Sequence, residues 1–311
     1  MHSQGVGYGK AILFGEHFVV YGLPGIAASI ELNTTCTYEK KTSGGIIAND
    51  LVTREIVRFG EDETKKLDQV LGVVLRETGV KEKNFRLKLS TNMSLMGGMG
   101  SSAALGVSIL RCLSEEFKLG LDNEEINRIT FEVEKVFHSN PSGIDNTVST
   151  FGGMLWFRKA EKNIIERLEI PEPVRVVLID TGIINDTAEL IAKVRKQKNE
   201  NSGEFEKIFS EYSELAPKAR KEIDGKRWEK VGALMNENQE LLRKMGVSSS
   251  SLEKIIGASL SAGAVGAKLT GAGVGGNVIA LTPEKELQED VAKECGKLGF
   301  KTFKVKAGIR P

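Results

Sequence analysis

The chain is poor in the residues that build disulfide frameworks and zinc sites. Among its 311 residues are three cysteines, far apart in the sequence, and three histidines. They form neither an even disulfide framework nor the close spacing of a structural metal site. No apolar run approaches the roughly 18 residues of a membrane-spanning helix, and no basic flank precedes an apolar segment at the start. We therefore expect a cytoplasmic protein without a membrane partner.

The chain also lacks an excess of charge of either sign. There are 43 Lys and Arg residues against 42 Asp and Glu, which gives a formal net charge of +1. Nucleic-acid binding requires a basic excess or patch, so we expect no nucleic-acid partner and favour a small molecule. With 40% hydrophobic and 27% charged residues the composition is that of a folded protein. The length favours one large domain or two moderate ones.

Hydrophobic periodicity predicts a mixture of strands and helices without a regular βαβ winding, and hence an α+β fold. An apolar strand from Lys10 leads to a Gly-Glu-His break, then to a second strand and a turn. The pattern predicts helices over 67–75, 103–117 and 284–298, and a further helix that is capped by Asp122 with Glu125 and ends near His138. It predicts strands over 85–90, 174–179, 302–305 and on both sides of a glycine loop within 264–281. Prolines at 171 and 173 mark a domain boundary, which divides the chain into 1–172 and 173–311.

Glycine is the residue present in excess, at 34 positions, and it is clustered. One cluster follows a predicted strand and opens onto a predicted helix. Backbone amides in such a loop, together with the positive end of the helix dipole, can hold phosphates. A tight turn with a serine cap is the alternative. Neither Gly-x4-Gly-Lys-Ser/Thr nor the dinucleotide-binding Gly-x-Gly-x-x-Gly after a first strand occurs. The cluster consists of Gly97, Gly98, Met99, Gly100, Ser101, Ser102 and Ala103.

A later cluster, which includes Gly271, Ala272 and Gly273, lies between two predicted strands and is too long for an ordinary hairpin. Close approach of the backbone to a ligand explains such a loop, and a bulged connection with positive φ angles is the alternative.

Two carboxylates, Glu134 and Asp145, suit a division of labour between a magnesium ion and an acceptor hydroxyl. Taken singly, each is more typical of a cap or a solvated charge. The residues Lys10, Glu16 and His17 are similarly ambiguous, since a strand-end lysine is usually exposed and a single histidine is more often structural.

Taken together, residues 10–22, 98–104 and 268–276 resemble the three signature motifs of the kinase superfamily that contains galactokinase, homoserine kinase, mevalonate kinase and phosphomevalonate kinase. Their order and spacing agree across the whole chain. Residues 9–22 and 140–153 look like the mevalonate kinase family specifically, and the chain length is similar to that of its archaeal members. The chain departs from the family pattern at four places. Gly7-Tyr8-Gly9 stands where Ala-Pro-Gly usually precedes the lysine, Ser94 replaces a proline, Gly98-Met99-Gly100 replaces Gly-Leu-Gly, and Val274 replaces a glycine.

The resemblance implies two domains around a cleft, the first with a left-handed βαβ unit and the second ferredoxin-like. It implies phosphorylation of the C5 hydroxyl of mevalonate by ATP in isoprenoid biosynthesis, with Mg²⁺ as cofactor and a homodimer as the assembly. The resemblance implies that Asp145 is the base, with Lys10 beside it, and that Glu134 with Ser101 or Ser102 binds Mg²⁺. It also implies that residues 97–103 and 271–273 bind ATP. The implied mevalonate-binding residues are Glu16, His17 and Thr181.

Two alternatives remain open from the sequence. A sister kinase acting on phosphomevalonate, homoserine or a sugar would share the nucleotide motifs. A non-catalytic paralogue that senses ATP or a metabolite would typically have lost the base or the metal carboxylate, whereas Lys10, Glu134 and Asp145 are all present.

Overall fold

The fold was taken from a computed structural model, which describes residues 2–93, 98–138, 141–161, 163–183 and 187–310. The strands are β1 (Gln4–Phe14), β2 (Pro24–Lys40), β3 (Ile46–Asp50), β4 (Ile56–Arg58), β5 (Phe85–Thr91), β6 (Met154–Arg158), β7 (Ile164–Leu168), β8 (Val174–Asp180), β9 (Gly266–Thr270), β10 (Asn277–Leu281) and β11 (Lys301–Ala307). The helices are α1 (Lys66–Thr78), α2 (Ser101–Phe117), α3 (Asn123–Phe137), α4 (Ile144–Phe151), α5 (Thr187–Glu200), α6 (Ser202–Asp224), α7 (Trp228–Lys244), α8 (Ser250–Ser261) and α9 (Lys285–Lys297), together with the 3-10 helix η1 (Phe18–Tyr21).

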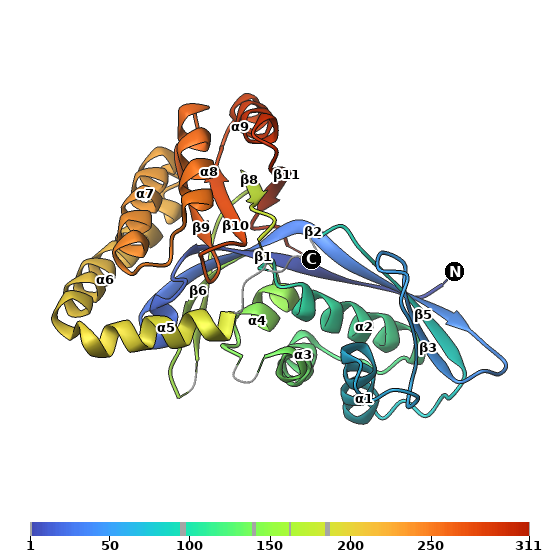
Figure 1. Ribbon diagram of the computed structural model, residues 1–311. Coiled ribbons are helices and arrows are strands. Elements are labelled where there is room, and N and C mark those ends of the chain that lie inside the picture. Colours follow the sequence, from blue (N-terminus) through green and yellow to red (C-terminus); the bar gives the residue numbers. More distant parts are fainter. Residues whose placement is uncertain (1, 94–97, 139–140, 162, 184–186, 311) are drawn as a thin grey trace.

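The long strand β2 organises the amino-terminal half. It pairs antiparallel with β1, β5 and β6, while β3 pairs parallel with β5 across a connection that contains α1. Helices α1 to α4 lie together on one side of these strands (Figure 1). Alternate residues of β5 are buried and pack with apolar residues of α1, α2 and α3, which form one hydrophobic cluster. This packing fixes the amino-terminal end of α2, where the first glycine cluster ends.

The carboxy-terminal half has the ferredoxin-like arrangement. Its strands occur in the order β11-β8-β10-β9 and all neighbouring pairs are antiparallel. In chain order these are the fourth, first, third and second strands, as in a βαββαβ fold, with α5 to α8 in the first connection and α9 in the second. The predicted α+β class is therefore confirmed. The handedness of the amino-terminal βαβ unit stays a prediction.

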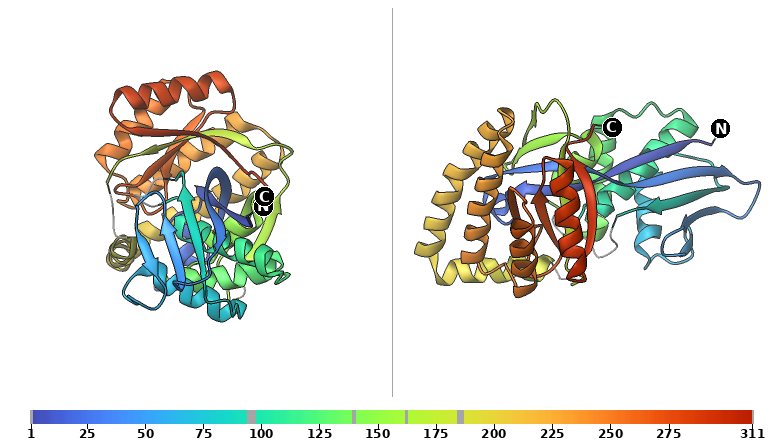
Figure 2. Two further views of the ribbon diagram at one scale, coloured as in Figure 1. Left: turned by 90° about the vertical axis from the view of Figure 1, so that its right-hand side faces the viewer. Right: turned by 90° about the horizontal axis from the view of Figure 1, so that it is seen from above.

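The two halves share part of their core. Ala307 of β11 pairs with Ile30 of β2, and one buried apolar cluster contains Phe14 and Ile30 together with Val176 and Leu269. The molecule is elongated, with α1 and β3 to β5 at one end and α6 and α7 at the other (Figures 1 and 2). The boundary at residue 172 stays a prediction, and the residues around it contribute to a common interior.

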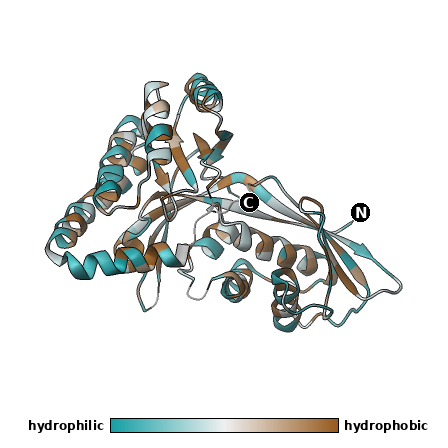
Figure 3. Ribbon diagram, in the orientation of Figure 1, coloured by the Kyte–Doolittle hydropathy of each residue, from teal (hydrophilic) through white to brown (hydrophobic). Residues whose placement is uncertain are grey.

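The helices carry their apolar residues on the sides that pack inward, and α5 is hydrophilic along most of its length (Figure 3). Within the described parts of the chain, no helix is both long and apolar enough to cross a membrane.

One predicted element was wrong. The run Phe18–Tyr21, predicted as a second strand, is the 3-10 helix η1, which ends at Gly22 with φ 77°. A short apolar run of this kind suits either structure, and here the amide of Val20 donates to the carbonyl of His17 at 3.2 Å. The ring of Phe18 stacks on Tyr212 of α6 with centroids 3.7 Å apart. This tertiary contact favours the compact turn over an extended strand.

Candidate active site

Lys10 and Asp145, far apart in the sequence, form an ion pair, with Nζ of Lys10 2.7 Å from Oδ1 of Asp145. Lys10 lies on β1, where its backbone amide donates to the carbonyl of Met99 at 2.7 Å. Asp145 lies in the first turn of α4. This helix begins directly after Gly143, which has φ 86° and ends the preceding loop. The lysine side chain is 7% exposed and that of the aspartate 26%, so the carboxylate remains open to a ligand. The structure thus brings together the two predicted catalytic residues.

The first glycine cluster lies against this pair. Gly98 and Gly100 have φ angles of 82° and 71°. A Cβ placed on Gly100 would lie 3.4 Å from the Cβ of Lys10, so the loop backbone runs directly over the lysine. The hydroxyl residues Ser101 and Ser102 begin α2 and are half-buried.

Not every residue of this cluster presents its side chain to the site. Met99 is 1% exposed and meets Lys10 through its backbone carbonyl, and Ala103 is fully buried in α2. Any contact that these two residues make with ATP would come from backbone groups. Gly97 lies outside the described residues.

Glu134, on α3, is the most perturbed acid of the site. It is 1% exposed, and burial, followed by the charge of Asp145, raises its pKa to about 7. The Ser102 hydroxyl and the charge of Lys10 act in the opposite direction. Its Oε1 is buried without a hydrogen-bond partner among the described residues. These residues hold no cluster of three or more His, Cys, Asp or Glu side chains that could alone enclose a metal ion. An unsatisfied carboxylate oxygen beside a second carboxylate and a serine fits a hard divalent cation that keeps other ligands.

The later glycine loop is held on both sides. The Nε2–H of His17 donates to the carbonyl of Ala272 at 2.7 Å, and the amide of Val274 donates to the carbonyl of Val247 at 2.7 Å. Gly273 has φ 89°, and a Cβ there would lie 2.2 Å from the Val247 oxygen. Only glycine fits at this position.

Val274 itself has φ 62°, which is unusual for a β-branched residue and marks local strain. The two glycine loops are neighbours, because a Cβ on Gly98 would lie 3.0 Å from Nδ2 of Asn277.

The Gly-Glu-His break places both of its ionisable side chains in the interior. The side chain of Glu16 is fully buried, in contact with the ammonium group of Lys268, and its Oε2 accepts from Nδ2 of Asn238 at 3.3 Å. His17 is 3% exposed, and burial lowers its pKa, which favours the neutral ring. Because a carbonyl can only accept, its contact with Ala272 fixes the Nε2–H tautomer and leaves Nδ1 as an acceptor.

Thr181 follows β8 and is tied to the end of the later glycine loop. Its amide and its hydroxyl both donate to the carbonyl of Gly276, each at 2.9 Å. Thr181 also lines a cavity of about 550 Å³, together with Met93 at the end of the β5 segment and Phe300 before β11. The cavity lies where the two halves meet.

The sequence analysis included Lys268 in the third signature motif but gave it no role, and it gave none to Asn238 or Asn277. Lys268 had a detectable signal, since it is the one charged residue within β9, a strand of small and apolar residues that is buried throughout. No local pattern marks Asn238, which reaches Glu16 from the middle of α7.

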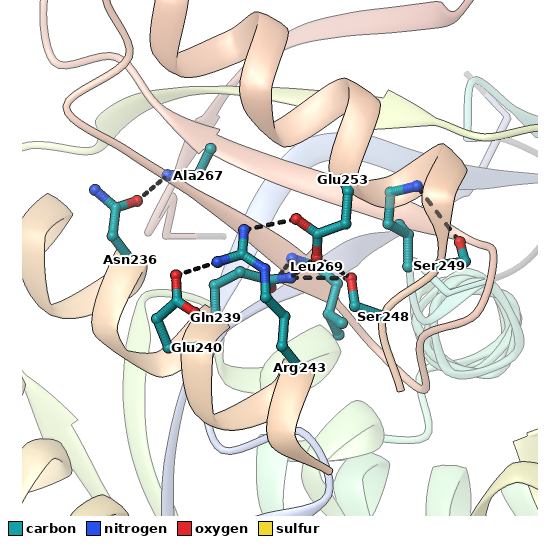
Figure 4. Close-up of polar contacts among 10 residues, drawn as sticks. Asn236, Gln239, Glu240, Arg243, Ser248, Ser249, Glu253, Ala267 and Leu269 are labelled. Atoms are coloured by element: carbon teal, nitrogen blue, oxygen red, sulfur yellow. Dashed lines mark hydrogen bonds and ion pairs between the residues drawn. The ribbon is translucent and has the colours of Figure 1, made fainter. Parts of the chain in front are cut away.

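Side chains of α7 also cap the outer edge of β9 (Figure 4). Oδ1 of Asn236 accepts from the amide of Ala267 at 2.9 Å, and Oε1 of Gln239 accepts from the amide of Leu269 at 3.0 Å. Gln239 donates in turn to Glu253 of α8 at 3.0 Å. An edge strand whose amides are satisfied in this way holds a fixed register, and so does the glycine loop that follows it.

Two family models match the chain. The GHMP kinases N terminal domain matches residues 65–153, and the GHMP kinases C terminal model matches residues 219–300. The first match contains Ser101, Ser102, Glu134 and Asp145, and the second contains Lys268 and the later glycine loop.

Relatives of known name agree with these matches. The mevalonate kinase of Thermococcus sibiricus is 37% identical, with 97% of this chain and 96% of that protein covered, and the mevalonate kinase of Pyrococcus abyssi is 37% identical, with 97% and 95% covered. The crystal structure of L. major mevalonate kinase in complex with R-mevalonate is similar with a TM-score of 0.89 at 29% identity, covering 98% of this chain and 95% of that one. That of Methanococcus jannaschii mevalonate kinase has a TM-score of 0.88 at 26% identity, and 99% of each chain is covered. The chain therefore belongs to the GHMP kinases and, within them, to the mevalonate kinase family.

Proposed function

We propose that the protein transfers the γ-phosphoryl group of ATP to the C5 hydroxyl of mevalonate, giving 5-phosphomevalonate and ADP, as a step of isoprenoid biosynthesis. The observation that carries the proposal is the 2.7 Å contact of Lys10 with Asp145 beside the amino-terminal end of α2. A carboxylate and an ammonium group next to a glycine-rich loop support the roles of base and cation, and the relatives of the chain are mevalonate kinases.

The residues divide the chemistry as follows. Asp145 accepts the proton of the C5 hydroxyl while that oxygen forms its bond to the γ-phosphorus and the bond from phosphorus to the ADP oxygen breaks. Lys10 orients the Asp145 carboxylate and offsets negative charge on the moving phosphoryl group. Phosphoryl transfer depends mainly on alignment and charge neutralisation, and both residues stand on regular elements that hold them in place.

Backbone groups of the glycine loops would hold the nucleotide. The amides at 98–103, together with the positive end of the α2 dipole, would bind the phosphates, and residues 271–273 would approach them from the other half of the molecule. The contact of Gly98 with Asn277 supports this placement, since it brings the two loops to one site.

Glu134 and a hydroxyl of Ser101 or Ser102 would hold Mg²⁺. The buried, unsatisfied Oε1 of Glu134 is the observation that fits a cation. When bound, Mg²⁺ supplies positive charge that neutralises the ATP phosphates.

His17 and Thr181 would face the acceptor. The neutral His17 ring presents Nδ1, which can accept a hydrogen bond from a substrate hydroxyl but offers no charge to a carboxylate. We further propose a cytoplasmic homodimer. The three cysteines are free and buried, which suits a reducing compartment, and light scattering after size-exclusion chromatography measures the assembly.

The test is ADP release from Mg-ATP by the purified protein, with mevalonate, phosphomevalonate, homoserine and galactose offered separately. We expect turnover with mevalonate and background rates with the others. Preference for another acceptor would keep the kinase chemistry and overturn the substrate. ATP binding without turnover on any acceptor would instead support a sensor.

A further inference from the structure

A fully buried ion pair joins the two halves of the molecule behind the acceptor end of the site. Glu16 follows β1, and Lys268 lies on β9. Their side chains are in contact, and each is 0% exposed. Neither residue takes part in the chemistry described above.

Protein groups occupy both oxygens of this carboxylate. Lys268 contacts Oε1, and Asn238 donates to Oε2 at 3.3 Å. The lysine ammonium also donates to the carbonyl of Leu269 at 2.6 Å. The Glu16 side chain thus has its partners inside the protein and presents no surface to a ligand.

Two further contacts run parallel to the ion pair. The amide of Ile12 donates to Oγ1 of Thr270 at 2.9 Å, and His17 donates to the carbonyl of Ala272. Together they tie residues 12–17 to residues 268–272 over a few ångströms. In the first segment Glu16 lies between the two hydrogen-bonding residues, whereas in the second Lys268 precedes both of them.

Stability alone is a weak reason for such a pair. Removing two charges from water costs several kcal/mol, and a well-packed apolar pair of similar volume is often as stable. What a charge pair adds is a defined geometry, because each group has few alternative partners in the interior.

We propose that Lys268 and Glu16, with Asn238, form a positioning unit, in which the buried carboxylate fixes the turn that presents His17 to the acceptor and does not itself contact the substrate. The role in catalysis rests on the function proposed above, whereas the effect on the His17 ring does not.

Three further side chains face this pair. His17 lies next in the chain, Asn238 comes from α7, and Tyr212 comes from α6, where burial and then the charge of Glu16 raise the pKa of the phenol. Burial lowers the pKa of Lys268, and Glu16 opposes that change. The charge of the Lys268 ammonium group therefore depends on its contact with the Glu16 carboxylate.

The first experiment compares Glu16→Gln, Lys268→Met and the double variant. Each single change leaves one unpaired buried charge, so we expect kcat/KM for mevalonate to fall by about 100-fold, the loss typical of a misplaced site, with KM for ATP changed only a few-fold. The double variant removes both charges, so it should regain at least about tenfold over the weaker single variant. If Glu16 binds mevalonate directly, the double variant will be no better than Glu16→Gln, and the proposal is overturned.

The second experiment follows the free energy of unfolding with pH and needs no substrate. In Lys268→Met the unpaired carboxylate must take up a proton to stay buried, so stability should fall as pH rises from 5 to 8. In Glu16→Gln the pKa of Lys268 falls further, the unfolded chain binds more protons than the folded one, and stability should rise with pH. The double variant should be insensitive to pH in this respect, as should the control Lys304→Met, which removes an exposed pair with Glu289.

The third experiment reads the His17 ring by nitrogen NMR, which is practicable because the chain has three histidines. The wild type should show a fixed Nε2–H tautomer for His17, both single variants an averaged one, and the double variant the fixed form again. An unchanged His17 ring in both single variants would refute the positioning role even if the acceptor assay failed for the wild type. Should a single variant not fold, Asn238→Leu removes only the contact to Oε2 and should shift the same signals in the same direction.

Discussion

The buried carboxylate of Glu134 makes the stability of the nucleotide-free protein depend on pH. Its pKa rises from 4.5 to about 7, mainly through burial and then through the charge of Asp145. A carboxyl group whose pKa is higher in the folded than in the unfolded state makes its full contribution to stability below its unfolded pKa. That contribution is lost as pH rises through the folded pKa. At about 1.4 kcal/mol for each pH unit, the change from 4.5 to about 7 corresponds to about 3 kcal/mol.

Glu134→Gln removes this titration while preserving the shape of the side chain. In the absence of metal and nucleotide, the variant should match the wild type at pH 4.5 and exceed it by up to about 3 kcal/mol at pH 8. Urea unfolding at half-unit pH steps in EDTA measures the difference. The matched control is Glu289→Gln, whose carboxylate is exposed on α9. Equal pH profiles for the wild type and Glu134→Gln would refute the reasoning.

Three further substitutions test other parts of the site. Asp145→Asn should lower kcat by at least about 100-fold, because the proton acceptor is lost. Calorimetry should find its ATP affinity within a few-fold of the wild type. Turnover within a few-fold of normal would contradict the role of Asp145 as base. Gly273→Ala should destabilise by about 3 kcal/mol, since the new Cβ meets the Val247 carbonyl at 2.2 Å, whereas Gly271→Ala, with open space around its Cβ, should cost only about 1 kcal/mol. Both values come from urea unfolding, and equal losses would argue against the close packing of this loop. Asn236→Ala should cost about 1 to 2 kcal/mol, because the Ala267 amide loses its acceptor, and that amide should then exchange its hydrogen faster. Unchanged exchange would show that the edge of β9 is satisfied in another way.

Much of the fold could be predicted from local patterns. The helix that follows Asp122 begins with the expected capping box, in which the Asp122 side chain and that of Glu125 each accept from the other's backbone amide. The alternation of β5 and the glycine loop between β9 and β10 are also as predicted. These features depend on neighbouring residues, so the sequence determines them directly.

Features that depend on tertiary contacts were harder to predict. The run Phe18–Tyr21 has the composition of a strand, and only its stacking on Tyr212 decides for η1. The burial of the Gly-Glu-His break was equally hard to predict, because no local pattern shows that Lys268 lies opposite Glu16. The sequence predicted which residues gather at the site, but not which of them the protein interior would enclose.

The order of strands in the carboxy-terminal half came from the resemblance to a family and not from periodicity. Hydrophobic patterns indicate β8, β9, β10 and β11 as strands but do not state which are neighbours. Pairing is a long-range property, and the register across β8 is set by the packing of α9 and the helices before β9.

The central claim is that this site phosphorylates the C5 hydroxyl of mevalonate, and phosphorus NMR of the product tests it most directly. The purified protein is incubated with Mg-ATP and mevalonate, and the spectrum is recorded with proton coupling. The account predicts ADP and one new phosphate monoester whose signal is a triplet, because the phosphorus couples to the two protons on C5. A singlet monoester, as from the tertiary C3 hydroxyl, or ADP with inorganic phosphate and no monoester, would contradict it.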